Sequence, residues 1–322
     1  MQNISPESPE ARRKRFAKAR ARFGKSVERV RAGSYPFEVL KRVAIGVYND
    51  GFIHARNLAY LALLTIFPFV IVAAAVARLL GQQSADGMDA IVGLLQVMPP
   101  DVAELLAKPI GDVLEARSGS LLWFGALVGL WTTGSFIETI RDVIRRAYGV
   151  TYSRPFWEYR LGSLGMIIAS VILAMVAFSI SIVLTGVQEF IVRLLPGGDD
   201  IVYLFTLLQI APGLVLFGSL YLLFYTLTPK RYRKEGCRKW PGAAFVTVWW
   251  LGTTALLPVA LSSLGGYPLT YGSLGGVMIA LISFFIIGLG VVIGAELNAA
   301  LAETPEEALK EDEEAFYNRE SI

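Results

Sequence analysis

The feature that most constrains this chain is a series of long apolar runs, most of them about twenty residues or more, separated by polar segments. A helix of about 20 residues crosses the ~30 Å hydrocarbon core of a bilayer and satisfies its own backbone hydrogen bonds there. Most of the runs have no polar face, which argues against a large soluble helical core. We therefore predict an all-α, polytopic membrane protein. Its six transmembrane helices are expected at about residues 58–80, 120–137, 162–187, 201–227, 242–262 and 273–300.

The distribution of basic residues predicts the orientation of these spans. Of the 30 Lys and Arg residues, 26 fall in the N-terminal segment, the loops after the second and fourth spans, and the C-terminal segment. Loops rich in Lys and Arg stay on the cytoplasmic side of a membrane. Both termini are therefore expected in the cytoplasm.

The chain divides by composition into three parts. Residues 1–34 are expected to form a basic, disordered cytoplasmic tail, and residues 303–322 an acidic cytoplasmic tail. Residues 35–302 form the membrane domain. Within it, amphipathic helices at about 84–117 are expected on the outer side, as a lid on the bundle or as a docking surface for a partner.

Two cytoplasmic segments indicate contact with lipid. The basic tail favours anionic head groups or control of topology over nucleic acid, because such clusters beside a span are attracted to anionic lipid. The segment PFEVLKRVAIGVYNDG places Phe37, Leu40, Ala44 and Val47 on one helical face. It is therefore expected to be an interfacial helix lying under the membrane.

Glu296 is the ionisable residue that most requires explanation, because it lies within the last apolar run. The predicted orientation places it near the cytoplasmic face, where a cation or water can reach it at modest cost. We expect it to bond Arg56, Asn57 or Arg141. This contact either locks helices together or borders a head-group or substrate site. The candidate polar cluster at this edge comprises Arg56, Asn57, Glu138, Arg141, Arg145 and Glu296.

Helix-breaking and small residues interrupt several spans. Pro68 and the pair Pro212–Gly213 fall within apolar runs, and a proline removes one helix hydrogen bond. Kinks there could line a cavity between helices. Gly290 and Gly294 have the spacing that lets helix backbones approach closely.

Several motifs together resemble the YihY/virulence factor BrkB family. The resemblance extends over roughly residues 35–302. It implies a bacterial inner-membrane protein with six helices, tied to envelope integrity, serum resistance and lipid movement, without a settled biochemical activity. The motifs are NLAYLALLTIFPFVIVAAAVARLLG, RDVIRRAYGVTYSRPFWEYRLGSL, KWPGAAFVTVWW and YGSLGGVMIALISFFIIGLGVVIGAELNAAL.

An older label of that family, ribonuclease BN, can be tested on the residues. A metal-dependent ribonuclease needs clustered ligands, and a metal-free one needs an acid–base pair, often of histidines. This chain has one histidine, His54, and one cysteine, Cys237. We therefore expect no enzyme, no cofactor and no metal site.

The function expected from the sequence is handling or transport of anionic lipid for envelope integrity. The partners would be membrane lipids, with an envelope protein or a second copy of the chain as a further possibility. Two alternatives stay open, a scaffold that recruits envelope partners and a secondary transporter of a small solute. The transporter is harder to place, because the predicted spans offer only neutral polar groups near their midplane.

Overall fold

The structure is a computed structural model, and its described part is entirely helical. It describes residues 7–23, 36–79, 119–150, 157, 160–165, 167–168, 211–233, 237–263 and 275–302. The helices are α1 (Pro9–Phe23), α2 (Pro36–Gly46), the π-helix η2 (Val47–Gly51), α3 (Phe52–Leu79), α6 (Gly119–Tyr148), α9 (Ala211–Leu227), α10 (Lys230–Arg233), α11 (Trp240–Ser263) and α13 (Gly275–Leu301).

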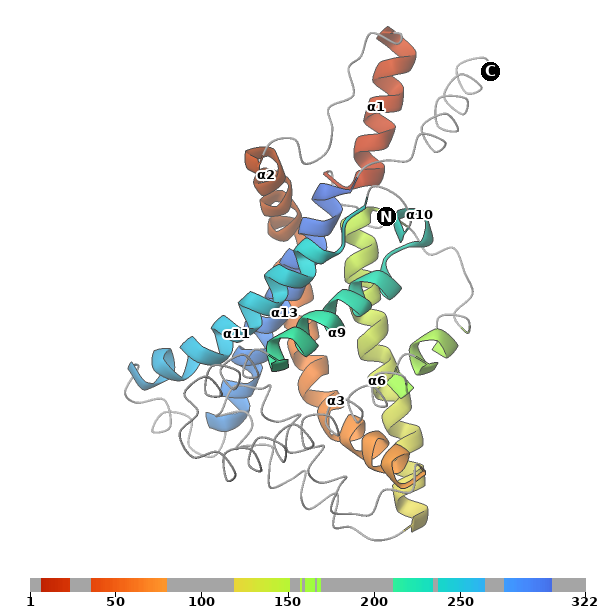
Figure 1. Cartoon of the computed structure of the whole chain (residues 1–322), viewed down its shortest axis with the longest axis vertical. Helices are drawn as coiled ribbons and strands as arrows, with labels where there is room; N and C mark the ends of the chain where they lie inside the picture. The colour runs from red at the N-terminus through yellow and green to blue at the C-terminus, as the bar shows by residue number, and fades with distance from the viewer. Residues whose placement is uncertain are drawn as a thin grey trace, which may run out of the picture.

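The long helices pack side by side, and several helix ends meet at one end of the bundle (Figure 1). Here the C-terminal ends of α6 and α13 lie beside α10 and the start of α11. The rings of Tyr148 and Tyr232, which lie 5.1 Å apart, join α6 to α10. We call this the basic end, because the basic loops of the sequence begin and end here. The segments that the sequence predicts on the cytoplasmic side therefore lie at the same end of the structure.

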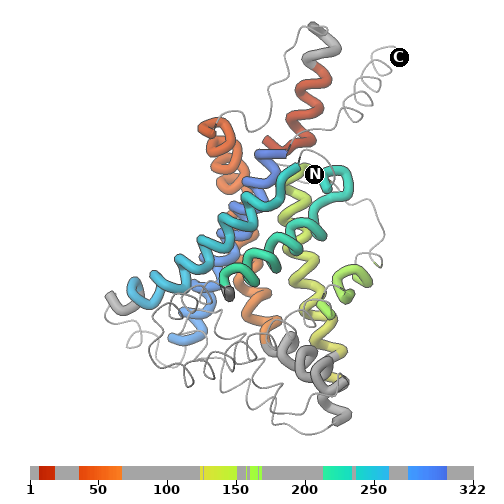
Figure 2. The backbone as a smooth tube through the Cα atoms, in the orientation of Figure 1, coloured from red at the N-terminus to blue at the C-terminus, as the bar shows by residue number. Residues whose placement is uncertain are grey.

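Helix α13 lies at the centre and packs against α3 on one side and α11 on the other (Figure 2). Small residues make this close approach possible. A Cβ at Gly290 would overlap the indole of Trp249, whose Nε1 donates a hydrogen bond to the Ile286 carbonyl at 2.8 Å. A Cβ at Gly294 would collide with Val246. The predicted role of these two glycines in helix packing is confirmed.

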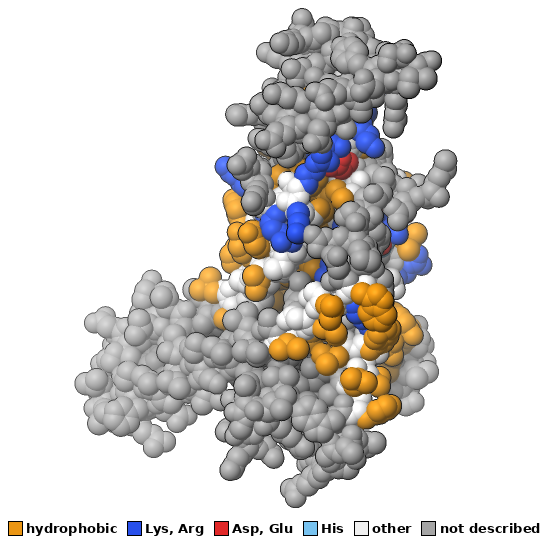
Figure 3. Space-filling view, turned by 90° about the vertical axis from the view of Figure 1, so that its right-hand side faces the viewer, with side chains coloured by type: hydrophobic (Ala, Val, Ile, Leu, Met, Phe, Trp, Pro, Cys, Tyr) orange, Lys and Arg blue, Asp and Glu red, His pale blue; other side chains and the backbone are white. Residues whose placement is uncertain are grey.

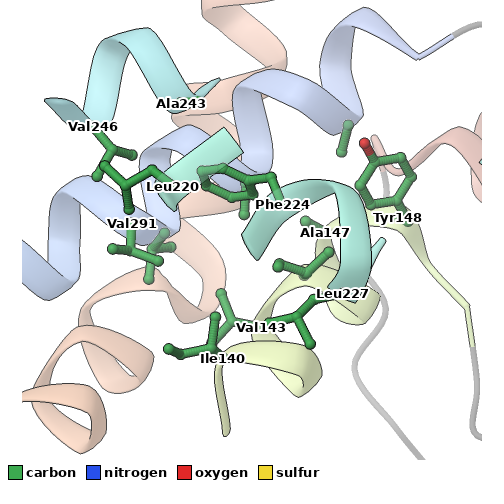
Figure 4. Close-up of a cluster of buried hydrophobic side chains, with 14 of the residues drawn as sticks. Ile140, Val143, Ala147, Tyr148, Leu220, Phe224, Leu227, Ala243, Val246 and Val291 are labelled. Carbon is green, nitrogen blue, oxygen red and sulfur yellow. The ribbon is translucent and has the colours of Figure 1, made fainter. Parts of the chain in front are cut away.

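A hydrophobic core fills the space between α6, α9, α11 and α13 near the basic end (Figure 4). Phe224 from α9 lies within it and is 1% exposed. Ile140, Ile144 and Ala147 recur on α6 at four-residue and three-residue spacing, so they share one face of the helix, and all three are buried. Burial of this face attaches the charged second half of α6 to the bundle.

The outer surface of the bundle is apolar away from the basic end. In Figure 3 hydrophobic side chains gather over the lower part of the described surface, and most Lys and Arg side chains lie above them. Leu127 on α6, Leu214 on α9 and Val248 on α11 are each more than 60% exposed. An extended exposed apolar surface is typical of a lipid or protein contact.

Two described helices, Trp240–Ala260 and Gly275–Leu301, are long and apolar enough to cross a membrane. They coincide with the predicted fifth and sixth spans. Helices α3 and α6 cover the predicted first and second spans, and α9 covers the second half of the fourth. Most of the third span, and the outer helices at 84–117, lie outside the described residues.

The N-terminal segment corrects one expectation. Residues 9–23 of the tail predicted to be disordered form helix α1, which extends beyond the bundle at the basic end (Figure 1). Ser8 starts the helix, since its Oγ accepts a hydrogen bond from the Ala11 amide at 3.3 Å. The charged sequence has no apolar stripe, so the sequence alone gives no reason for α1 to dock.

Candidate functional site

Glu296 lies on the wall of a small cavity where five helical segments, α2, η2, α3, α6 and α13, meet near the basic end. Its volume is about 20 Å³, which is room for about one water molecule. We call it the polar cavity. Its lining residues are Gly46, Asn49, Asp50, Gly51, His54, Val143, Arg146, Val292 and Glu296.

The π-helix η2 forms one wall of the polar cavity. It joins α2 to α3 without leaving helical geometry, since both flanking residues, Gly46 and Phe52, have right-handed helical dihedrals. A π-turn holds one more residue than an α-turn and occurs often at functional sites. Here it places Asn49, Asp50 and Gly51 in succession on the wall.

Gly46 makes space for the Glu296 side chain. A Cβ at this position would overlap the carboxyl group of Glu296, so the carboxyl lies directly against the backbone of α2. Val39 and Val43 of α2 pack against Ala300 of α13 and hold the two helices together there. The missing side chain thus determines where the carboxylate sits.

Two carboxyl groups, those of Asp50 and Glu296, lie on the wall of the polar cavity, and no described residue is bonded to either of them. Asp50 acts on Glu296 as a nearby like charge. Among the described residues, neither carboxylate accepts a side-chain or backbone hydrogen bond, and the buried Nε2 of His54 has no partner. Arg146 is already held, because its Nε donates to Asp142 Oδ2 at 2.8 Å.

The predicted partners of Glu296 do not line the cavity. Arg56 and Asn57 are exposed, because the adjacent Ala55 and Leu58 face Gly288 on α13 and turn that side of α3 inward. Arg141 is also absent from the wall. The expected contact is therefore corrected. Glu296 faces Asp50, His54 and Arg146.

Glu138, another member of the predicted cluster, pairs with a residue that the cluster omitted. Arg160 lies across α6, is 3% exposed, and its Nη1 lies 3.3 Å from Glu138 Oε1. Its guanidinium also stacks 4.0 Å from the centroid of the Trp131 ring and donates hydrogen bonds to Ser135 Oγ and to the Trp131 carbonyl. Gly134 leaves room for it, because a Cβ at this position would lie only 3.2 Å from Arg160 Cζ.

Arg141 and Arg145 are each 8% exposed, so their side chains are buried and do not form a solvent-exposed charged surface at the basic end. Both lie on the buried part of α6, beside the core residues Ile140 and Ile144. A buried guanidinium is tolerated only when it is paired and hydrogen-bonded. These two arginines therefore belong to the interior of the bundle.

Two arginines close the C-terminal end of α13. Arg12 Nη2 donates to the Ala299 carbonyl at 2.8 Å, and Arg42 Nη1 donates to the Ala300 carbonyl at 3.5 Å. The last carbonyls of a helix have no partner within it and carry partial negative charge. Burial lowers the pKa of Arg12 to about 10, and the charge of Arg42 acts in the same direction.

A second contact docks α1 on α10. The Tyr232 hydroxyl, on a side chain that is 0% exposed, donates to Glu10 Oε1 at 2.7 Å. Burial and this hydrogen bond raise the pKa of the Tyr232 phenol above its ordinary value. Glu10 also pairs with Arg13 at 2.8 Å and Arg231 at 3.5 Å.

Asn298 joins α13 to the start of α11. Its Oδ1 accepts the Gly242 amide at 2.8 Å, and its Nδ2 donates to the Lys239 carbonyl at 3.1 Å. The first amides of a helix need an acceptor from outside the helix. Asn298 supplies one, and it is 1% exposed.

Three residues, Pro68, Pro212 and Gly213, were predicted to line a cavity at helix kinks. A Cβ at Gly213 would be in ordinary contact with Leu251 at 3.6 Å, so this glycine lies where α9 meets α11. Pro68 lies within α3, and Pro212 lies in the first turn of the described part of α9. Gly213 is not on the wall of the polar cavity, and the side chains of Pro68 and Pro212 lie outside the described residues.

Several residues of the site were missed from the sequence, namely Gly46, Asp50, Arg146, Arg160 and Asn298. The sequence GVYNDGFIH contains the signal for the first two, because two glycines flank polar residues just before a span. Within the described residues no group of three or more His, Cys, Asp or Glu side chains has an arrangement that could hold a metal ion.

The central apolar helices, the exposed apolar surface and the basic end together define a helical membrane protein. The chain belongs to the Virulence factor BrkB family, whose family model matches residues 48–316. The match includes η2, Glu296 and every described helix except α1 and α2. Membership brings no established enzymatic activity with it.

A curated relative is the ribonuclease-like protein YfkH of Bacillus subtilis, a name that itself leaves ribonuclease activity unproven. It is 27% identical to this chain over 255 residues, which cover 79% of this chain and 90% of the relative. No solved structure matches this chain.

Proposed function

We propose that this protein handles anionic phospholipid at the cytoplasmic leaflet of the bacterial inner membrane. It would cross the membrane six times with both termini in the cytoplasm. The clustering of the basic loops supports this topology, because positively charged loops stay on the cytoplasmic side. The role in envelope integrity expected from the sequence would follow from lipid handling at this face.

The observation that carries the proposal is an exposed apolar stripe on α2 and η2. Phe37 is 79% exposed, Leu40 66% and Tyr48 83%. The opposite face of α2 is buried against α13 through Val39 and Val43. The stripe therefore points away from the protein, as in a helix that lies in the membrane interface with its apolar side in the acyl chains.

Exposed cations provide the attraction for anionic head groups. Lys41 lies on α2 and Arg56 on the first turns of α3, and both are exposed. Lys230 and Arg238 are exposed around α10. Each such residue contributes about 1 kcal/mol of attraction to an anionic leaflet, and a Debye length limits its range. Insertion of the apolar stripe and attraction of these cations to anionic head groups both favour binding of α2 to the membrane surface.

The test is native mass spectrometry of the purified protein after a delipidating detergent wash. We expect wild type to retain anionic lipid, and the variant Lys41→Ala/Arg56→Ala to retain less while its thermal unfolding stays unchanged. Arg141→Ala/Arg145→Ala is less informative, because both arginines are buried and their loss would destabilise the fold.

A matched control separates insertion from charge. Phe37→Ser/Tyr48→Ser removes apolar surface and keeps every cation, so it should weaken binding to neutral and anionic vesicles alike. The double charge variant should weaken binding to anionic vesicles only. If wild type retains no lipid and ignores vesicle charge, lipid handling is wrong, and a scaffold for envelope partners becomes the better explanation.

A further inference from the structure

The polar cavity is lined by two carboxyl groups, so it is not a site for the phosphate of an anionic lipid. Asp50 and Glu296 face it from opposite elements, η2 and α13, and neither accepts a hydrogen bond from any described residue. Two carboxylates close together at low dielectric repel strongly unless a positive charge or a proton is shared between them. A buried polar group without a partner requires an explanation of this kind.

The other charged groups around the cavity do not neutralise this pair. Arg146 from α6 is bonded to Asp142 at 2.8 Å, so the charges of these two cancel locally. His54 from α3 is the remaining titratable group on the wall, and its Nε2 is buried without a partner among the described residues. The described wall therefore keeps an excess of negative charge.

The size of the cavity limits what can bind. Its volume of about 20 Å³ admits one particle about as large as water. Asn49 adds an amide side chain to the wall, and Gly46 and Gly51 contribute backbone without side chains. Oxygen atoms from carboxylates and an amide are the donors that a hard monovalent cation prefers.

We propose that the polar cavity binds one small monovalent cation of about the size of ammonium or potassium, between the carboxylates of Asp50 and Glu296. The cation could be free in the cytoplasm, or it could be the primary ammonium of a phospholipid head group. Both present one positive charge, and the –NH3+ group itself is about as large as ammonium or potassium. This site goes beyond the proposed handling of anionic lipid and stands independently of it.

The test compares thermal unfolding of the delipidated protein in ammonium, potassium and choline chlorides at equal ionic strength. Choline is too large for the cavity and corrects for general salt effects. We expect the midpoint in ammonium or potassium to exceed that in choline by about 2–4 °C. Asp50→Asn and Glu296→Gln should each abolish the difference. Glu7→Gln should keep it, because Glu7 pairs with exposed Arg15 outside the cavity.

A second measurement keeps the test decisive if one variant folds poorly. Retention of radioactive rubidium, a potassium mimic, is measured directly on wild type and Asp50→Asn, and only wild type should retain it. To separate the two sources, phosphatidylethanolamine or phosphatidylcholine is added without inorganic cation. Stabilisation by phosphatidylethanolamine alone assigns a lipid ammonium, whereas stabilisation only by the salts assigns a free cation. Equal midpoints in all salts and lipids, or a difference that survives both substitutions, would overturn the site.

Discussion

The contact between Asn298 and the start of α11 gives the sharpest test of how this bundle is held together. Asn298→Ala removes both hydrogen bonds of the side chain. The Gly242 amide then loses its acceptor while it stays buried. The Lys239 carbonyl keeps one partner, because it also accepts a longer hydrogen bond of 3.4 Å from the Ala243 amide.

The expected cost comes mainly from the Gly242 amide. Leaving one buried donor unsatisfied costs about 1–3 kcal/mol, and loss of a helix cap typically costs about 1 kcal/mol. These two figures describe largely the same bond, so we expect a loss of about 2–3 kcal/mol, including the small void left by the amide. For a chain of this size that corresponds to a midpoint about 4–10 °C lower.

The assay is thermal unfolding in detergent, followed by tryptophan fluorescence at one fixed scan rate. Asn298→Asp keeps an acceptor for Gly242 but buries a carboxylate that faces the Lys239 carbonyl, so it should not restore stability. Thr132→Val is the matched control, since the Thr132 hydroxyl bonds only to carbonyls of its own helix, at 3.1 and 3.2 Å. If Asn298→Ala costs no more than Thr132→Val, the inter-helix cap contributes nothing and the reasoning fails.

Three further predictions concern the other contacts. Arg160→Lys should lower the unfolding midpoint, because lysine cannot reproduce both the stacking on Trp131 and the hydrogen bonds, and an unchanged midpoint would contradict this. Gly46→Ala should destabilise by about 1–3 kcal/mol, and Gly46→Ala/Glu296→Ala should recover part of this loss. Additive effects in that cycle would show that the two residues do not touch. Docking of α1 should be complete below about pH 10 and weaken above it. The pKa of Tyr232 is raised only while α1 is docked. Above about pH 10 the released state therefore loses the phenol proton that the docked state keeps, and rising pH favours release. The anisotropy of a probe on Lys18→Cys would follow the release. The lowered pKa of Arg12 acts in the opposite direction above about pH 10 in both proteins, so wild type is compared with Tyr232→Phe, and only wild type should show the loss of docking that comes from the phenol.

Sequence alone predicted those features that depend on local pattern. Apolar runs place the helices, and the three-residue and four-residue spacing of Ile140, Ile144 and Ala147 identifies the core face of α6. The spacing of Gly290 and Gly294 predicts a close helix contact in the same way. Each of these needs only the geometry of one helix.

The polar contacts could not be predicted in this way. The predicted topology places Glu296 near the cytoplasmic face of the membrane. It does not say toward which neighbouring helix the side chain points. Arg56 and Asn57 lie near the level of Gly288, about two turns from Glu296 along α13, and both are exposed. Asp50 reaches the wall of the polar cavity through a π-turn, which no periodicity in the sequence predicts. Arg160 reaches Glu138 from 22 residues further along the chain. Helix α1 is stabilised by Tyr232 and Ala299, far away in the sequence.

The contacts of Arg12 and Arg42 with the last turn of α13 have a consequence for biosynthesis. Both arginines are translated long before the carbonyls of Ala299 and Ala300 that they cap. The N-terminal helices therefore cannot find their final positions until the last helix has left the ribosome and entered the bilayer. Closure of this face thus waits for α13, and a product truncated before α13 would leave Arg12 and Arg42 open to proteolysis.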